Sequence, residues 1–402
     1  MITIVEINTS NYASTGNIMN NISKQARLHN INVFTCVKAS KESFKYKFEN
    51  QIYIGFRIER IVSSIMATVT GLRDHFNIIG TFVFIKKIKK INPDLIHLHV
   101  LHDNFINIKL LFKYLSKTNI PIIWTFHDCC AMTGKCPCFT MVKCEKWIDG
   151  CYSCPQLNEY TKSFFDTTRL IWNERKKAFT SIKNLTIVTP SKWLKSLVDL
   201  SYFNKYKTKL IYNGIDLSVY KNNPINNKDI KNNEKYIVLG VANVWNESKG
   251  LYDFIKLSKM LSNKYQIVLV GTNDEIDKIL PNSITSIHRT YKQEDLVELY
   301  SKANVFVNPT KQEVFGLVNV EALACGTPVI TYDVGGCSEI ITEKCGIKVE
   351  LNNINMLKEK IEYVCINKPF NKNDCINRAN DFDIVDKANE YIKLYKELLC
   401  KI

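Results

Sequence analysis

The sequence predicts an α/β protein built from two doubly wound parallel sheets. Short apolar runs rich in β-branched residues alternate with segments of helical periodicity along almost the whole chain. Such alternation indicates parallel strands with helices on both faces of each sheet. The runs number about a dozen, which is too many for one compact domain of this type. The length of 402 residues provides enough chain for two cores, so we expect two domains.

Each expected strand is a short apolar run bounded by polar or turn-forming residues. In the first half these runs are Ile2–Ile7, Ile31–Val37, Asp94–Val100, Pro121–Phe126, Leu185–Thr189 and Lys209–Tyr212. In the second half they are Tyr236–Ala242, Tyr265–Gly271, Thr285–Arg289, Asn304–Asn308, Pro328–Tyr332 and Gly346–Val349. Helical periodicity lies between them in Phe105–Ser116, Asp166–Ser181, Gly250–Leu261, Gln293–Lys302 and Leu317–Ala324. This order is typical of two Rossmann-like domains.

The boundary between the domains is predicted in segment 213–235, which is polar, rich in Asn and contains Pro224. The first domain is then 1–212 and the second 236–383. The last helical pattern, Ile384–Leu399 within 384–402, either closes the second domain or crosses back to the first. Ligands of doubly wound sheets bind beyond the carboxyl ends of the strands. We therefore expect the functional residues directly after strands.

Composition and charge restrict the classes of partner. The chain is 46% hydrophobic and 23% charged, which excludes a disordered, collagen-like or coiled-coil protein. Its formal net charge of +15 favours an anionic partner, such as a membrane surface or a phosphorylated substrate. Nucleic acid is not expected, because the lysines are spread without a long basic block. The basic and apolar segment Phe82–Ile91 is either a helix packed on a sheet or a contact with a membrane surface.

The sequence contains no recognisable leader or membrane span. Its first residues, MITIVEINTS, are typical of a strand, not of a signal peptide. The most apolar window, Ile52–Leu72, is interrupted by Arg57, Glu59 and Arg60. We therefore expect a cytoplasmic protein whose 14 cysteines are thiols, unless some of them bind metal.

The stretch EVFGLVNVEALACG, which begins at Glu313, places two carboxylates on either side of a turn that suits an anion. A helix is predicted to begin near Phe315 or Gly316, and its first amides lack partners and carry the positive end of the helix dipole. Gly316 allows a phosphate to approach the backbone. Glu313 and Glu321 flank this turn, and a carboxylate can accept hydrogen bonds from neighbouring sugar hydroxyls. Considered separately, Glu313 would be an acidic residue at the positive end of the helix dipole, and Glu321 would be a solvated residue of the helix.

This stretch resembles the motif of two glutamates separated by seven residues in the retaining GT-B glycosyltransferases of family four. The resemblance extends to CGTPVITYDVGGCSEII, to NGID at Asn213–Asp216 and to PSKW at Pro190–Trp193. It covers the second half best, and it implies a GT-B fold, in which two Rossmann-like domains face a central cleft. It implies a nucleotide diphosphate sugar as donor.

The same resemblance implies a role for each residue at the turn. Glu313 would bind the transferred sugar as a catalytic residue, and Glu321 would bind the ribose. The backbone of Phe315, Gly316 and Leu317 would bind the distal phosphate.

Family members commonly place an Arg and, six residues later, a Lys after the first strand of this domain, and both hold the diphosphate. Here Lys249 is present, but Asn243 stands at the Arg position. Either the diphosphate has one cation fewer or another basic residue replaces the Arg.

Candidate residues of the first half also follow predicted strands. Gly16, in INTSNYASTGNIMNNIS, resembles a flexible glycine loop beside donor phosphates; a plain strand-to-helix turn is the alternative. His127 ends its strand, and the resemblance implies that it contacts the donor sugar or phosphate as a catalytic residue. Asp128 beside it and His102 are candidates for binding the acceptor. His97 and His99 alternate with apolar residues, so we expect them to be packed or to line a pocket.

The region Cys129–Cys154 contains half of the cysteines, and its pattern resembles a subgroup of glycosyltransferases of capsule, exopolysaccharide and lipopolysaccharide synthesis. Cys130 and Cys138 are extra to that pattern. Four cysteines that end in C-x-x-C offer a tetrahedral set for structural zinc, with reduced thiols packed in the loop as the alternative. These four are Cys136, Cys144, Cys151 and Cys154. The loop follows His127, so we expect it to shape an acceptor pocket.

The resemblance implies a retaining sugar transfer without a catalytic metal ion, and no Asp-x-Asp metal motif is placed for one. The implied acceptor is a glycan, carried on a lipid at the inner membrane face, during synthesis of a surface polysaccharide. Three alternatives remain open: a GT-B sugar-nucleotide epimerase, a glycan phosphorylase, and a Cys-rich zinc module that binds nucleic acid. The donor base, the sugar, the linkage and the oligomeric state are not predicted by these motifs.

Overall fold

The computed structural model describes residues 1–160, 162–222, 235–290 and 292–400. Contacts within the chain divide it into two compact units. The first unit is Met1–Tyr212 with Val385–Ile402, and the second is Asn213–Ile384. Most of the expected linker 213–235, including Pro224, lies outside the described residues.

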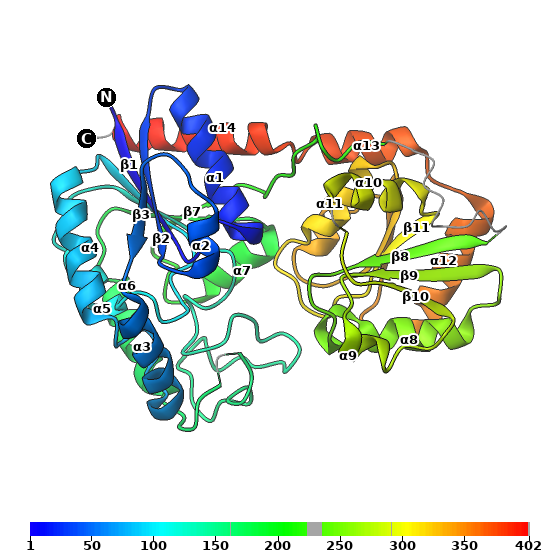
Figure 1. Cartoon of the computed structure of the whole chain (residues 1–402), viewed down its shortest axis with the longest axis horizontal. Helices are drawn as coiled ribbons and strands as arrows, with labels where there is room; N and C mark the ends of the chain where they lie inside the picture. The colour runs from blue at the N-terminus through cyan, green and yellow to red at the C-terminus, as the bar shows by residue number, and fades with distance from the viewer. Residues whose placement is uncertain (161, 223–234, 291, 401–402) are drawn as a thin grey trace. The chain divides into compact units, whose positions relative to one another are not determined.

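The first unit contains a parallel sheet of seven strands in the order β3-β2-β1-β4-β5-β6-β7 (Figure 1). The strands are β1 Thr3–Asn8, β2 Asn32–Lys38, β3 Gln51–Ile54, β4 Leu95–Leu98, β5 Ile122–Thr125, β6 Leu185–Thr189 and β7 Lys207–Leu210. The helices are α1 Ala13–Leu28, α2 Lys41–Lys45, α3 Arg57–Thr70, α4 Ile78–Ile91, α5 Ile108–Leu115, α6 Thr168–Phe179 and α7 Lys192–Leu200. Strands β4, β5 and β6 are buried along their whole length, which their continuous apolar sequences predict for the middle of a parallel sheet.

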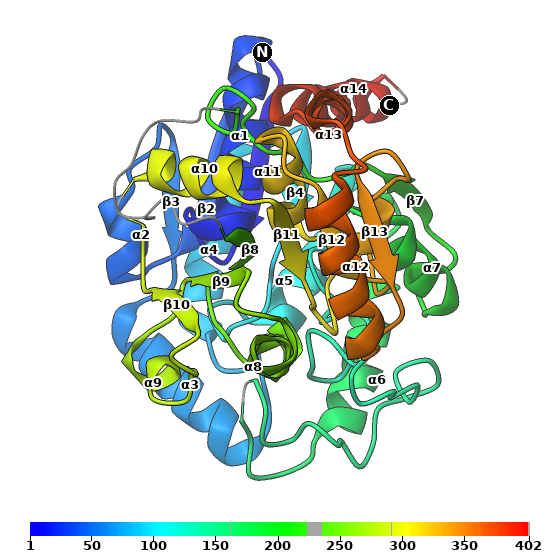
Figure 2. The same cartoon turned by 90° about the vertical axis from the view of Figure 1, so that its right-hand side faces the viewer.

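The second unit contains a parallel sheet of six strands in the order β10-β9-β8-β11-β12-β13 (Figure 2). The strands are β8 Tyr236–Val241, β9 Tyr265–Val270, β10 Ile284–Ile287, β11 Val305–Asn308, β12 Val329–Tyr332 and β13 Gly346–Val349. The helices are η1 Glu247–Lys249, α8 Leu251–Met260, α9 Asp274–Asp277, α10 Gln293–Lys302, α11 Leu317–Ala324, η2 Cys337–Glu339, α12 Ile354–Asn367 and α13 Lys372–Asn380. Two parallel sheets covered by helices confirm the predicted fold class.

The last helix, α14 Ile384–Leu399, packs in the first unit beside α1, as Figures 1 and 2 both show. Its tyrosines join a polar network in the core. The Tyr395 hydroxyl donates to Glu6 Oε1 at 2.9 Å and lies 2.7 Å from Nδ1 of His97. Because Glu6 and His97 are fully buried, their polar atoms need partners within the protein. The helix therefore supplies a hydroxyl that the sheet requires.

The strand order reverses between β1 and β4 in the first sheet and between β8 and β11 in the second. In open parallel sheets, ligands bind at such points, beyond the carboxyl ends of the strands. None of the helices formed by the described residues is long and apolar enough to cross a membrane.

Candidate active site

The second unit joins Lys249 and Glu313 at the point where its strand order reverses. Lys249 lies in the loop after β8 and Glu313 in the loop after β11, and Lys249 Nζ is 2.6 Å from Glu313 Oε2. The two loops are in direct contact, since the Thr310 hydroxyl donates to the carbonyl of Ser248 at 3.1 Å. The structure thus places a cation and a carboxylate together beyond the strand ends. Both side chains keep partial exposure, so a ligand can reach them.

The backbone around Glu313 is held by glycines. A Cβ on Gly335, whose φ is +55°, would lie 1.8 Å from the carbonyl oxygen of Glu313, so no larger residue fits there. The neighbouring Gly336 amide donates to that same oxygen at 3.1 Å. Gly316 caps α11 with a φ of +90°, a left-handed conformation that favours glycine. These contacts fix Glu313 directly before the amino end of α11.

The amino end of α11 is the predicted anion site. The helix begins at Leu317 directly after Gly316, and no side chain caps it. Phe315 is buried and anchors the turn. Asn319 accepts from the Asn308 side chain at 2.8 Å, which ties the first turn to β11. The amide of Asn319 donates to the carbonyl of Gly316 at 3.0 Å, so the amides of Leu317 and Val318 are the ones that can bind a phosphate.

Glu321 lies one turn further along α11, where the hydroxyl of Tyr300 donates to its Oε2 at 2.9 Å. Burial raises the pKa of Glu321, while hydrogen bonds from Tyr300 and Tyr220 oppose the rise. A carboxylate has about four acceptor positions, so the two tyrosines leave room for further hydrogen-bond donors. Neither tyrosine was among the predicted site residues, because neither belongs to the motif.

Asn243, at the position of the family arginine, is exposed after β8. The basic residue of the loop after β11 is Lys311. Its backbone amide donates to the carbonyl of Ser248, in the loop after β8, at 2.8 Å. Its Nζ lies 3.7 Å from Glu247 and 3.8 Å from Asp253. Lys311 is therefore already engaged by two carboxylates, which argues against it as the replacement for the arginine.

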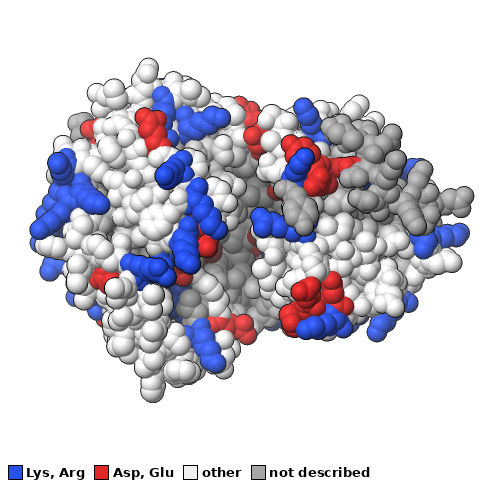
Figure 3. Space-filling model, viewed as in Figure 1, with Lys and Arg blue, Asp and Glu red and all other residues white. Residues whose placement is uncertain are grey.

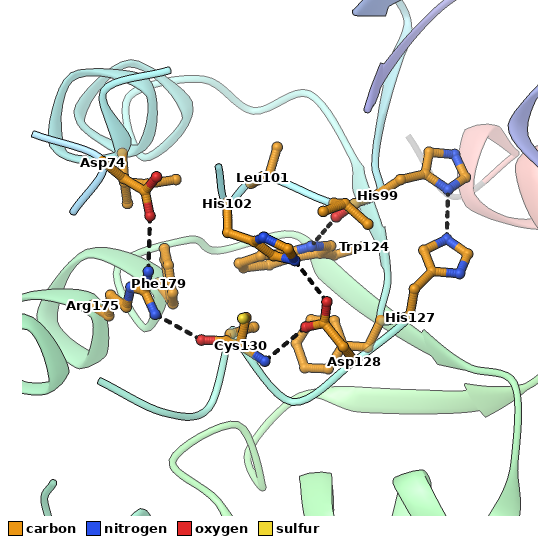
Figure 4. Close-up of a pocket in the computed structure, with 14 residues that line it drawn as sticks. Asp74, His99, Leu101, His102, Trp124, His127, Asp128, Cys130, Arg175 and Phe179 are labelled. Atoms are coloured by element: carbon orange, nitrogen blue, oxygen red, sulfur yellow. Dashed lines mark hydrogen bonds and ion pairs between the residues drawn. The ribbon is translucent and has the colours of Figure 1, made fainter. Parts of the chain in front are cut away.

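The first unit gathers its candidate histidines at the ends of β4 and β5 (Figure 4). His99 Nδ1 lies 3.1 Å from His127 Nε2, and their rings stack with centroids 5.4 Å apart. Burial lowers the pKa of His127 to about 4, although Asp128 opposes the shift. Burial, with His97 and His127, also lowers the pKa of His99 well below its ordinary value. Both rings are therefore neutral at pH 7.

His102 and Asp128 form an ion pair beside these rings, with His102 Nε2 2.7 Å from Asp128 Oδ2. Burial would lower the pKa of His102, but Cys130 and Asp128 outweigh it and raise that pKa well above its ordinary value. Burial would raise the pKa of Asp128, but His102 lowers it. The hydroxyl of Tyr160 lies 3.1 Å from His102 Nδ1. One pocket thus contains two neutral histidines, His99 and His127, and one charged histidine, His102.

The pocket is closed on its other side by a buried ion pair. Arg175 of α6 lies 2.9 Å from Asp74 and donates to the carbonyls of Cys130 and Thr133. The residues that line the pocket are Asp74, His99, Val100, Leu101, His102, Ile108, Trp124, Phe126, His127, Asp128, Cys130, Ala131, Arg175 and Phe179. His97 is absent from this lining and fully buried. Arg175 was not predicted, because a lone arginine in a helix carries no motif.

Of the two interpretations of Gly16, its position fits the plain strand-to-helix turn and not a flexible loop, and its role in donor binding stays a prediction. Gly16 is buried in the first turn of α1, and a Cβ there would lie 2.6 Å from the backbone of Asn11. The glycine therefore serves a close approach between the helix and the preceding loop.

The cysteine loop runs from β5 to α6, and its described residues form no helix or strand. Cys136, Cys144, Cys151 and Cys154 line one small cavity. Among the described residues, the groups whose ligand atoms all lie within 4.8 Å of one another are Glu6–His97–His99 and His102–Asp128–Cys130. The four thiols are close neighbours but do not meet that distance.

Two family models match the chain. Residues 222–382 match the model described as "Glycosyl transferases group 1". Residues 22–219 match the model described as "Glycosyltransferase Family 4". Together the two models span most of both units.

Curated relatives and a solved structure are similar to the chain. An N,N'-diacetylbacillosaminyl-diphospho-undecaprenol alpha-1,3-N-acetylgalactosaminyltransferase of Campylobacter jejuni is 31% identical over 180 residues, 43% of this chain and 47% of that protein, so the match spans about half of it. A putative colanic acid biosynthesis glycosyl transferase, WcaC, of Escherichia coli is 22% identical over 288 residues, 69% of this chain and 67% of that protein. The sucrose-phosphate synthase of Thermosynechococcus elongatus has a TM-score of 0.76 at 17% identity, with 100% of both chains covered. That likeness shows the fold alone.

Proposed function

We propose that this chain, which belongs to family four of the GT-B glycosyltransferases, transfers a sugar from a nucleotide diphosphate sugar to a glycan acceptor in the synthesis of a surface polysaccharide. The observation that carries the proposal is the contact of 2.6 Å between Lys249 and Glu313 beside the uncapped amino end of α11. A cation, free amides and a carboxylate together match a sugar diphosphate: the first two bind phosphate and the third binds hydroxyls.

The transfer retains configuration in this proposal. The bond between the anomeric carbon and the phosphate oxygen breaks, and its electron pair leaves with the nucleotide diphosphate. The acceptor oxygen bonds to that carbon from the same face, and its proton passes to the departing phosphate oxygen. Lys249 exchanges Glu313 for the diphosphate and, with the first amides of α11, stabilises the developing charge. These groups supply the stabilisation without a divalent ion, so the rate should not rise when Mg²⁺ or Mn²⁺ is added.

In the first unit we assign two roles to the pocket at the strand ends. His127, held neutral, offers a hydrogen bond to a donor hydroxyl without adding charge. His102 and Asp128 bind the acceptor, because a charge-assisted pair keeps both side chains in fixed positions. The Cys129–Cys154 loop begins beside this pair and shapes the acceptor pocket.

A lipid-linked acceptor is supported by an apolar surface on α3 and its neighbours. The buried residues of α3 are Ser63 and Ala67, whereas its large apolar side chains face outward. We call the following exposed side chains the α3 face: Ile58, Ile61, Val62, Ile65, Met66 and Val69 of α3, Ile78, Ile79 and Phe82 of α4, and Phe164 and Phe165. Hydrogen bonds join these segments, from Ile79 to Glu59 at 2.7 Å and from Phe164 to Thr68 at 3.0 Å. Surfaces of this kind mark interaction sites.

The occupant that we propose for the α3 face is the headgroup and acyl boundary of an anionic membrane. Figure 3 shows few charged residues where α3 lies and a group of basic residues at the edge over α4. The exposed lysines of α4 are Lys86, Lys87, Lys89 and Lys90, and the whole chain has a net charge of +15. Apolar insertion flanked by lysines is the combination that binds anionic lipid surfaces. Both interpretations of Phe82–Ile91 have support. Phe84 and Ile88 are buried, as expected for a helix packed on a sheet, and Phe82 is exposed, as a membrane contact requires.

The donor site is tested by thermal unfolding with UDP, GDP and ADP. A ligand that binds only the folded chain raises its Tm by mass action, so one of the three should raise it. The shift should disappear in Lys249→Met and persist in Lys256→Met, an exposed lysine of α8. No shift with any nucleotide diphosphate or its sugar conjugates would contradict the donor site.

The α3 face is tested by flotation with vesicles of phosphatidylcholine, with and without phosphatidylglycerol. The wild type should float with the anionic vesicles, and the double variant Ile61→Glu, Ile65→Glu should not. A matched control is Ile366→Glu with Leu351→Glu, two exposed apolar residues of the second unit. The double variant should still use a water-soluble acceptor fragment. A wild type that stays in the aqueous layer, or that hides this face in a dimer seen by light scattering, would overturn the membrane contact.

A further inference from the structure

The cysteine loop is a long segment without regular secondary structure. Its described residues between Thr125 and Thr168 form no helix or strand, and such long irregular segments are uncommon in compact domains. The interior of the loop is small: Phe139 and Trp147 stack with centroids 4.7 Å apart. Lys135 Nζ donates to the carbonyl of Gln156 at 2.8 Å. A cross-link that closes a long loop of this kind would add to its stability.

Four thiols surround the cavity beside that aromatic pair. Cys136, Cys144, Cys151 and Cys154 line it together, although they come from three separate turns of the loop. The other three cysteines of the loop, Cys129, Cys130 and Cys138, do not line it. Four of the loop's thiols therefore line one cavity, and the others do not.

The backbone is shaped to present three of these four side chains. Lys143, Gly150 and Ser153 have φ values of +47°, +148° and +44°, and each directly precedes a cysteine of the set. A residue other than glycine in the left-handed region costs about 1 kcal/mol, which persists only where the surroundings demand that conformation. In addition, the Gly134 amide donates to Cys151 Sγ at 3.1 Å. Amide donors to sulfur are the outer-shell contacts that support a thiolate ligand.

The surroundings also match the charge of a metal–thiolate centre. A divalent ion with four thiolates has a net charge of about −2. Lys135 and Lys146 both line the cavity, and Lys135 is only 2% exposed. Both ammonium groups donate to backbone carbonyls, Lys135 to Gln156 and Lys146 to Ser153 at 3.0 Å, and their positive charge would be complementary to a negatively charged metal–thiolate centre.

We propose that one zinc ion cross-links the loop by binding four cysteines: Cys136, Cys144, Cys151 and Cys154. Four sulfur ligands in a tetrahedral arrangement favour zinc. The sulfurs must approach to about 3.8 Å from one another, as a Zn–S length near 2.3 Å requires, and this calls for a shift inward from their positions in the structure. On binding, each thiol gives its proton to the solvent. The site is separate from the donor site of the second unit, so it stands whether or not the proposed transfer is correct.

The first test measures zinc in the wild-type protein, purified without chelator, by inductively coupled plasma mass spectrometry. We expect about one zinc ion per chain. Cys136→Ser, Cys144→Ser, Cys151→Ser and Cys154→Ser should each lower that content several-fold, whereas Cys138→Ser should not. Cys138 is the matched control, because it lies in the same loop and outside the cavity.

A second measurement holds even if the serine variants fail to fold. The reduced, metal-stripped wild type is alkylated with iodoacetamide in the presence or absence of Zn²⁺, and the labelled peptides are quantified by mass spectrometry. Zinc should slow labelling of the four cysteines at least several-fold and leave the exposed Cys400 unchanged. Wild-type protein with substoichiometric metal and no protection by Zn²⁺ would overturn the proposal. The proposal would also be overturned if the mass of the purified protein were lower than its sequence requires and a reductant restored it, since this would indicate disulfides.

Discussion

Most candidate residues of the second unit come from one short stretch, with Lys249 and Asn243 added from the loop after β8, whereas those of the first unit are brought together from several distant parts of the chain. Glu313, Gly316 and Glu321 lie within a single loop and helix. His102 and Asp128 follow different strands, and Arg175 comes from a helix beyond a long irregular loop. A site encoded mainly in one stretch depends largely on local turn geometry, with a few tertiary contacts such as that from Lys249 to Glu313. A site assembled from several segments needs the packing of the whole unit, so we expect its substitutions to affect stability as well as activity.

The largest expected effect is on catalysis in the second unit. Glu313→Gln keeps the size of the side chain but removes the charge that pairs with Lys249. We expect kcat to fall by about 100-fold or more, as for loss of one group that stabilises a transition state. The Tm shift with nucleotide diphosphate should remain. Glu343→Gln, at an exposed position of the same unit, is the control, and a Glu313→Gln enzyme with unreduced turnover would refute the assigned role.

The next effect concerns stability in the first unit at acid pH. The pKa of His127 is lowered to about 4, so the unfolded chain binds this proton first as the pH falls. Its contribution to stability is complete above the ordinary pKa of about 6.5 and is lost between there and about 4. The loss is on the order of 3 kcal/mol.

Urea unfolding of His127→Asn from pH 4 to 7 should therefore show a flatter dependence on pH than the wild type. His29→Asn, an exposed histidine, should keep the wild-type slope. His102→Asn should act in the opposite direction: its raised pKa stabilises the fold below about pH 6.5, and this stability disappears as the pH rises through the folded value. If the unfolding free energy depended on pH with the same slope in all three variants, the opposite pKa shifts assigned to His127 and His102 would be contradicted.

The smallest expected effect is at Glu321. Tyr300→Phe removes a hydroxyl that donates to this carboxylate at 2.9 Å, and the loss should cost about 1–2 kcal/mol of unfolding free energy. The variant separates stability from catalysis in the second unit. We expect it to lose this unfolding free energy while its kcat stays within a few-fold of the wild-type value. Calorimetry measures the unfolding free energy, and a sugar-transfer assay measures kcat. A large drop in kcat instead would place Tyr300 in the catalytic machinery.

Most strands were predictable because strands buried on both faces are continuous apolar runs. All twelve expected runs overlap observed strands, with ends that differ by one or a few residues. β3 was missed, because this edge strand buries only Ile54 fully and so lacks the apolar run. The outward apolar face of α3 was also missed. Its periodicity is that of an ordinary amphipathic helix, and periodicity alone does not state which face is turned to the core.

Local pattern in this chain was enough to establish the order of twelve of the thirteen strands, the two-sheet fold, and the turn between Glu313 and Glu321. Each depends on residues close together in the sequence. Packing alone decided that α14 completes the first unit, that His99 contacts His127, and that Tyr300 holds Glu321. It also showed that Gly16 serves a helix contact and not a loop. These features depend on pairs of segments that are distant in sequence, and a buried polar atom takes whichever partner the fold brings within hydrogen-bond distance.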